Sequence, residues 1–115
     1  MLKIFSMSYK VKTIDIFEKQ AKKLFRKYVS LKSELLKLVL DLKENPVQGT
    51  PLGNNCFKIR IAISSKGKGK RGGARVITHI FISDDTVYML SIYDKSGKDI
   101  LTLNEIKELI NSLSE

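Results

Sequence analysis

The side chains best suited to chemistry in this chain are the cations between positions 51 and 81. Seven lysines and arginines fall in this stretch and no aspartate or glutamate does: Lys58, Arg60, Lys66, Lys68, Lys70, Arg71 and Arg75. Unpaired cations this close together repel one another unless an anion lies among them. Because nucleic acids are the natural polyanions, the stretch predicts a site that binds a phosphate backbone.

Formal charge is concentrated rather than evenly spread along the chain. The net charge is +9, and residues 1–50 hold 11 Lys/Arg against 5 Asp/Glu. Residues 82–115 hold 3 Lys/Arg against 7 Asp/Glu, so this last part is negative. An even bias would serve solubility, whereas this clustering favours a polyanion partner.

Length and cysteine content limit the number of domains and the kinds of site that this protein can have. The 115 residues predict one domain, 1–115, and Met7 offers an alternative start that would make residues 1–8 an N-terminal extension. Cys56 is the single cysteine, so one chain builds neither a disulfide framework nor a zinc site, and we expect no metal and no cofactor. A membrane-spanning run of about 18 apolar residues and a secretory signal are both missing, which predicts a cytoplasmic protein without a membrane partner.

Hydrophobic periodicity predicts an α+β domain. Alternation at 9–13 predicts an N-terminal strand, and two apolar stripes at helical spacing predict a helical hairpin. The first helix follows Asp15, which stands in a capping-box spacing with Glu18; the second runs from Ser30 to Asn45, where a proline stops it. A loop is expected next, at 45–55. A three-stranded antiparallel meander follows, with strands at 56–63, 73–82 and 86–93. A C-terminal helix is expected from a capping box formed by Thr102 and Glu105.

The first helix has two contrasting faces. Its apolar stripe is formed by Phe17, Ala21, Leu24 and Tyr28. The opposite face is cationic and comprises Lys19, Lys22, Lys23, Arg26 and Lys27. Such a face is either simply solvated or an addition to the polyanion-binding surface.

Strand alternation separates an apolar from a cationic face of the sheet. The apolar set is expected to pack on the helices: Ile59, Ile61, Ile63, Val76, Thr78, Ile80, Ile82, Tyr88, Leu90 and Ile92. The other set is expected to share an open surface beside the basic loop: Lys58, Arg60, Arg75, His79, Ser91 and Tyr93. A polar solvated face is common in antiparallel sheets, but here no carboxylate is placed to pair with the cations.

The glycine-rich loop is not a nucleotide-binding motif. Gly67 to Gly72 formally match G-x-G-x-x-G, but a strand rather than a helix follows. The loop instead exposes backbone N–H groups and Lys66, Lys68, Lys70 and Arg71 to phosphates, or is only a mobile hairpin tip. His79 is either a general acid or base, or simply a residue on the strand surface. Tyr93 either stacks on a nucleobase, supports proton transfer, or only packs against its neighbours.

These residues resemble the RelE/ParE superfamily of toxin–antitoxin toxins, and more closely its HigB-like, RelE-type branch. The likeness covers nearly the whole chain and lies in the segments Tyr9-x-Val11, Thr13-x-x-x-Phe17, Asn45-Pro46-x-x-Gly49, Phe57-Lys58-Ile59-Arg60, Gly67 through Ile77, and Tyr88 through Lys95. The order of elements expected above is also that family's fold: an N-terminal strand, a helical hairpin, a three-stranded antiparallel meander and a C-terminal helix.

The resemblance implies a ribosome-dependent mRNA endonuclease that needs no metal. Such toxins enter the ribosomal A site, between mRNA and ribosomal RNA, and are inhibited by a cognate antitoxin protein. The ribose 2′-hydroxyl attacks the neighbouring phosphorus and a 5′-hydroxyl leaves. Preorganised cations suit this step because negative charge grows on the phosphoryl oxygens.

Site roles follow from the resemblance. Lys58 and Arg60 match the family's basic pair, Arg75 matches the clamp on the scissile phosphate, and Lys95 matches a candidate proton donor. RelE commonly has lysine where Arg60 stands, and arginine is essentially never deprotonated, so the base here is Lys58, a loop lysine or Tyr93, or positioning replaces it. The RelE tyrosine near the C-terminus has no counterpart, because Leu101 falls about there.

Two other functions remain open from the sequence. A ParE-like toxin on the same fold would inhibit DNA gyrase by binding alone, and a plain RNA-binding module would do no chemistry. A convergent cationic site favours cleavage, because a pure binder does not need one.

Overall fold

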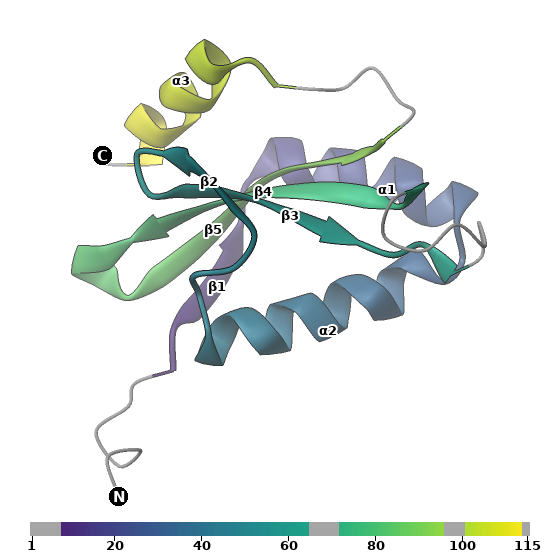
Figure 1. Cartoon of the computed structure of the whole chain (residues 1–115). Helices are drawn as coiled ribbons and strands as arrows, with labels where there is room; N and C mark the ends of the chain where they lie inside the picture. The colour runs from purple at the N-terminus through teal and green to yellow at the C-terminus, as the bar shows by residue number, and fades with distance from the viewer. Residues whose placement is uncertain (1–7, 65–71, 96–100, 114–115) are drawn as a thin grey trace, which may run out of the picture.

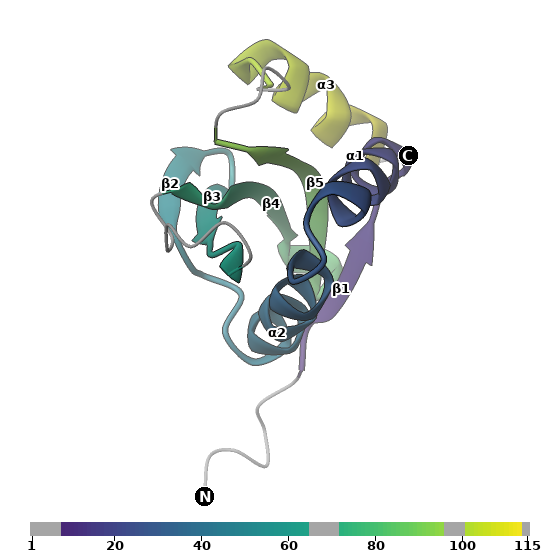
Figure 2. The ribbon, with the colours of Figure 1, turned by 90° about the vertical axis from the view of Figure 1, so that its right-hand side faces the viewer.

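A five-stranded sheet is covered by helices on both faces (Figures 1 and 2). The structure, a computed structural model, describes residues 8–64, 72–95 and 101–113. The suggested N-terminal extension, 1–8, therefore lies outside the described residues except for its last position.

The sheet contains the expected meander. Its strands are β1 (Lys10–Thr13), β2 (Thr50–Gly53), β3 (Cys56–Ile61), β4 (Ala74–Phe81) and β5 (Thr86–Asp94), in the order β1-β5-β4-β3-β2. β3, β4 and β5 are antiparallel neighbours, as the short connections predict. β1 extends the sheet by pairing parallel to β5, so the first and the last strand along the chain are neighbours.

The expectation of a loop at 45–55 is wrong in part, because β2 lies within it. β2 pairs antiparallel with the first half of β3. Its Pro51 and Gly53 hide the strand signal, and proline is tolerated here because an edge strand has one side free of ladder hydrogen bonds. Gly49 leads into β2 with φ +88°, and an added Cβ would lie 2.3 Å from the Lys58 carbonyl oxygen, so this position requires glycine.

The helical hairpin and the C-terminal helix lie on opposite faces of the sheet. α1 (Asp15–Lys27) and α2 (Leu31–Glu44) cover one face, and α3 (Leu103–Leu113) covers the other (Figure 2). The capping box of α3 is confirmed: Glu105 N–H donates to Thr102 Oγ1 (3.1 Å) and Thr102 N–H to Glu105 Oε1 (2.9 Å). The one expected for α1 is wrong, because Ile14 is the N-cap and Glu18 instead accepts from the Thr13 hydroxyl.

Two apolar layers hold these helices. The larger one joins Phe17, Leu31 and Leu38 of the hairpin to Ile59, Val76 and other buried residues of the sheet. The smaller one joins Ile106 of α3 to Cys56, Ile77, Leu90 and Tyr93. Ile82, expected in the packed face, is exposed because β4 ends one residue earlier.

A β-bulge in β5 reverses the side-chain alternation halfway along the strand. Ile77 pairs with Ser91 while its neighbour Thr78 pairs with Met89, so Leu90 is an extra residue. Met89 consequently lies in the layer under the hairpin and Leu90 in the layer under α3, the reverse of what plain alternation predicts. Tyr88 also packs on the α3 side. After the bulge, Ile92 and Tyr93 return to their expected faces.

Gln20 of α1 bonds to the backbone at the bulge. Its Oε1 accepts from Ile92 N–H (3.0 Å) and from the Ser91 hydroxyl (3.0 Å). Ser91 was expected on the open face, but this contact directs its hydroxyl to α1. A side-chain acceptor is suited to this place, because a bulge leaves backbone groups without ladder partners.

We predict that Gln20→Leu lowers the free energy of unfolding by about 1–3 kcal/mol, since it leaves a partly buried N–H without an acceptor. Gln20→Glu keeps the acceptor oxygens and should lose clearly less. Urea unfolding followed by circular dichroism measures both variants. Equal losses would show that the hydrogen bonds to the bulge do not matter.

Candidate nucleic-acid interface

Three of the predicted site residues form one row across the sheet. Arg60 of β3 is the register partner of Arg75 on β4, and Arg75 is the partner of Tyr93 on β5. Directly paired residues have their Cβ atoms about 4.5–5.5 Å apart on the same face. We call Arg60, Arg75 and Tyr93 the cationic row. The row lies on the α3 side of the sheet, because side chains alternate along a strand and the neighbouring residues pack under the hairpin. These neighbours are Ile59, Val76 and Ile92.

The solvent exposure of the side chains decreases along the cationic row. Arg60 at the β3 end is exposed, whereas Arg75 and Tyr93 are only 7% and 8% exposed. The prediction of a wholly open face is therefore wrong, because α3 and its apolar side chains cover the Tyr93 end. Arg75 donates from Nη1 to the Ala74 carbonyl (3.2 Å). A guanidinium held in such a low-dielectric place acts more strongly on an anion than one in water.

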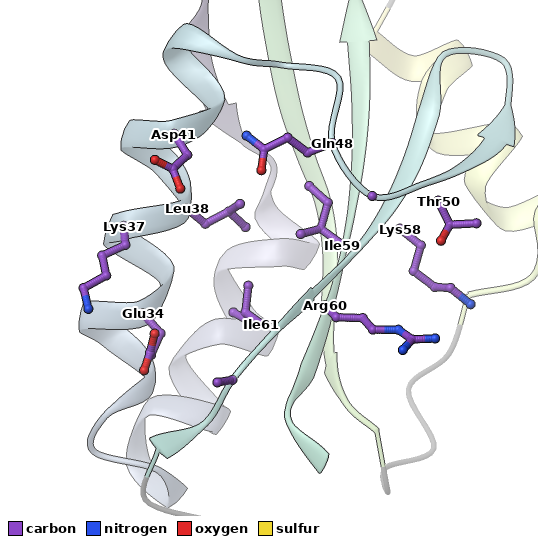
Figure 3. A pocket seen from close by; sticks show the side chains of 12 residues that line it. Glu34, Lys37, Leu38, Asp41, Gln48, Thr50, Lys58, Ile59, Arg60 and Ile61 are labelled. Atoms are coloured by element: carbon purple, nitrogen blue, oxygen red, sulfur yellow. The ribbon is translucent and has the colours of Figure 1, made fainter. Parts of the chain in front are cut away.

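Lys58 extends the cationic surface along β3. It lies two residues before Arg60, and Figure 3 shows both side chains pointing away from α2. Lys58 is half-buried. Within the described part of the chain neither side chain has a carboxylate partner. The expected lack of neutralising acids on this face thus holds for these two cations.

Lys95 lies at the loop end of the sheet. Its backbone N–H donates to the Gly73 carbonyl (3.1 Å), and its side chain is exposed. Ile61 and Ala74, the last pair of the β3–β4 ladder, stand one position beyond Arg60 and Arg75. The cationic row and Lys95 are therefore close to the base of the glycine-rich loop. The loop cations Lys66, Lys68, Lys70 and Arg71 themselves lie outside the described residues.

His79 does not join an exposed basic surface, which corrects the sequence prediction. Its side chain is 6% exposed, and its Nδ1 lies 3.5 Å from the Cys56 thiol on the neighbouring strand. Burial lowers the pKa of His79, although a hydrogen bond with the Asn54 backbone acts in the other direction. Burial also raises the pKa of the Cys56 thiol to about 11. Both groups are consequently neutral near pH 7, and His79 offers no charge to a phosphate.

Two supporting residues were not found from the sequence. Asp94 follows Tyr93 in β5 and is buried, and its Oδ2 accepts from the Tyr28 hydroxyl at the end of α1 (2.6 Å). Gln20 fixes the bulge that places Tyr93. Alternation puts Asp94 on the hairpin side of the sheet, but no local pattern connects residues 66 positions apart.

A groove beside the sheet borders the cationic row at Arg60, one of its lining residues. It measures about 480 Å³ and lies between α2 and β3 (Figure 3). Glu34 and Asp41 stand on its α2 wall, and Ile59 and Ile61 point into it from β3. Lys58 and Arg60 border it but point away. The α2 wall of the groove carries mixed charge, because Lys37 stands between Glu34 and Asp41.

Solved structures of RelE toxins resemble this arrangement. The isolated E. coli RelE toxin has a TM-score of 0.57 at 16% identity, over 92% of this chain and 99% of RelE. An arginine-to-alanine mutant of E. coli RelE in the free state has a TM-score of 0.61 at 18% identity, over 90% and 99% of the two chains. The chain has the RelE fold. The toxin–antitoxin complex RelBE2 from Mycobacterium tuberculosis also matches, with a TM-score of 0.57 at 19% identity, over 79% and 95%.

No protein-family model matches the sequence. Among residues 8–64, 72–95 and 101–113 of this RelE fold, no helix is long and apolar enough to cross a membrane. Nor do three or more His, Cys, Asp or Glu side chains of these ranges gather where they would hold a metal ion.

The buried His79 of this RelE fold makes stability depend on pH. Its folded-state pKa lies below the 6.5 of an ordinary histidine, so the unfolded chain binds the proton more tightly. We predict that the free energy of unfolding falls as pH drops from about 7.5 to about 5.5, and falls less in His79→Gln. Urea unfolding at each pH measures the difference. Parallel pH profiles for the two proteins would contradict the prediction.

Proposed function

We propose that this chain is the toxin of a type II toxin–antitoxin system and cleaves mRNA on the ribosome. The observation that carries the proposal is the cationic row: two guanidinium groups and a phenol on three adjacent strands, close to a basic loop. The RelE fold supports it, since solved structures with a similar arrangement are RelE toxins. A site of this kind serves transition-state stabilisation better than simple binding, because its cations converge on one place.

The reaction is a transesterification within the RNA strand. The 2′-oxygen attacks the adjacent phosphorus, the bond from phosphorus to the 5′-oxygen breaks, and a 2′,3′-cyclic phosphate remains. One proton leaves the 2′-hydroxyl and one is delivered to the departing 5′-oxygen. No metal is required, because the chain's own cations neutralise the charge that grows on the phosphoryl oxygens.

Roles follow from position in the row. Arg75 is central and buried between Arg60 and Tyr93, so it is the clamp on the scissile phosphate. Arg60 contacts the same or the next phosphate from the exposed end, and it is not the base because its guanidinium keeps its proton. Tyr93, held by packing at the other end of the row, or Lys58 on β3 accepts the proton of the 2′-hydroxyl. Lys95, at the loop end of the sheet, donates the proton to the 5′-oxygen.

Partners follow from the same proposal. The RNA partners are mRNA and ribosomal RNA in the A site, which the loop cations Lys66, Lys68, Lys70 and Arg71 contact. The protein partner is a cognate antitoxin that covers the basic face; the RelBE2 neighbour is itself a toxin–antitoxin complex. Such a toxin works in the cytoplasm, where translation takes place.

We predict that Arg75→Ala lowers the cleavage rate by about 10²–10³, the usual effect of losing one transition-state donor. The rate is measured by primer extension on mRNA in a cell-free translation reaction. Arg75→Lys keeps the charge but not the fork of donors and should show an intermediate loss. Lys32→Ala on α2 is the matched control and should cleave normally. Normal cleavage by a folded Arg75→Ala protein would overturn the assignment.

Tyr93→Phe separates the chemical from the packing role of Tyr93. The ring stays in the layer under α3, so the melting temperature should stay close to that of the parent. Loss of the hydroxyl should lower the cleavage rate by about 10²–10⁴, as expected for a group that moves a proton. An unchanged rate would reduce Tyr93 to a packing residue.

One induction experiment separates cleavage from the other functions. Mapping of mRNA ends in cells, with and without active translation, should give cuts positioned by codon only when translation runs. DNA damage without such cuts would indicate gyrase inhibition and would refute the proposal.

A further inference from the structure

The half of β5 that carries Tyr93 has a strand on one side only. β1 pairs with β5 from Thr86 to Met89, so in the described part of the chain no strand lies beside Leu90–Asp94 on that edge. On the other edge β4 pairs with β5 as far as Asp94. A free strand edge leaves backbone N–H and C=O groups without ladder partners. This half of β5 therefore depends on side chains for support on its free edge.

Two side chains of α1 take the place of the missing strand. α1 packs on β5 (Figure 2). Gln20 accepts a hydrogen bond from the Ile92 N–H at the bulge. About two turns later, at the C-cap of α1, the Tyr28 hydroxyl donates to Asp94 Oδ2 (2.6 Å). Because Asp94 is the last residue of β5, the helix supports the strand both at the bulge and at its end.

Tyr28 is itself firmly held where the two helices of the hairpin meet. Its backbone N–H donates to the Leu24 carbonyl of α1 (2.8 Å), and its carbonyl accepts from the N–H of Leu31, the first residue of α2 (3.2 Å). Its side chain packs on the apolar layer under the hairpin. The phenol therefore reaches Asp94 from a fixed point of the scaffold.

Asp94 stands between two residues that the proposed reaction uses. Tyr93 precedes it and completes the cationic row, and Lys95 follows it, with its N–H bonded to the Gly73 carbonyl (3.1 Å). Successive side chains of a strand point to opposite faces, so a bond that holds Asp94 toward the hairpin also holds Tyr93 toward Arg75. Placement matters here, because an error of about 1 Å in such groups can cost about 10²-fold in rate.

Stability alone does not explain a carboxylate at this position. Asp94 is 6% exposed, and its register partner Ala74 belongs to the apolar layer under the hairpin. Burial of a polar group costs free energy, and apolar residues of similar shape often stabilise such a place as well or better. A hydrogen bond differs from an apolar contact in that it is directional. The pair is therefore better suited to placing the end of the strand than to stabilising the protein.

We propose that Tyr28 and Asp94 are positioning residues for RNA cleavage. Their hydrogen bond fixes the end of β5, and with it Tyr93 and Lys95, relative to the two arginines of the cationic row. This inference rests on the proposed function. Both residues act from the hairpin side of the sheet and do not touch the RNA, which lies at the row on the α3 side.

Tyr28→Phe tests the proposal, because it removes the hydroxyl and keeps the ring. Ile80→Val is the matched control, since it takes one carbon from the same apolar layer and usually costs a comparable free energy of unfolding. Ile80 pairs with Val87, far from the end of β5. Single-turnover cleavage is measured with increasing concentrations of mRNA-programmed ribosomes, which separates the maximal rate from the half-saturating concentration.

Tyr28→Phe should lower the maximal rate by about 10-fold to 10²-fold. The half-saturating ribosome concentration should stay the same, because the cations that bind RNA are unchanged. Asp94→Asn should be slowed less, since its amide oxygen still accepts the hydroxyl proton, and Ile80→Val should cleave at the parental rate. An unchanged rate in Tyr28→Phe would overturn the proposal, as would an equal loss in Ile80→Val or a larger loss in Asp94→Asn.

Hydrogen exchange gives a second measurement that does not depend on cleavage. In Tyr28→Phe the Lys95 N–H should exchange faster, while the amides of the β3–β4 ladder should exchange as in the parent. Exchange that rises equally across the whole sheet would show a general loss of stability and would count against a positioning role. Faster exchange at the end of β5 in a protein whose parent does not cleave mRNA would instead refute the proposed function alone.

Discussion

The site depends on the β-bulge in β5 and on the Gln20 side chain that bonds to it. Val87 and Met89 lie in the layer under the hairpin, so regular alternation would put Tyr93 in that same layer. One extra residue, Leu90, moves Tyr93 to the α3 side, where it meets Arg75. Two hydrogen bonds from α1 support the bulge, and the helical hairpin therefore contributes to the site on the opposite face. A bulge next to a functional site is a common way in which proteins redirect one side chain.

The two ends of the cationic row have different surroundings. Arg75 and Tyr93 are enclosed by the layer under α3, while Arg60 and Lys58 stay accessible on β3. From the exposed β3 side inward, the cations of the row are increasingly shielded from water. The positions of these groups are fixed by strand pairing rather than by loops, an arrangement that is preorganised for an anion.

Local chemistry made much of this fold predictable from the sequence. β3 and β4 are regular, so alternation correctly brought Arg60 and Arg75 together, and the reciprocal spacing of Thr102 and Glu105 fixed the start of α3. β2 was missed because Pro51 and Gly53 hide the signal of an edge strand. The faces predicted for the first half of β5 were wrong, because the sequence gives no sign of the bulge. The burial of His79 followed from which face α3 covers, a long-range choice that periodicity does not encode.

The pairing of β1 with β5 also bears on the order in which the protein is made. β1 is the first strand along the chain, yet its parallel partner begins at Thr86, after every other strand. Such distant pairings are slow to form, because a long intervening segment must be ordered first. The same late segment brings Tyr93 to the two arginines. A nascent chain that has emerged only through β4 thus lacks both the partner of β1 and the third member of the cationic row, so both are completed only when the last strand is in place.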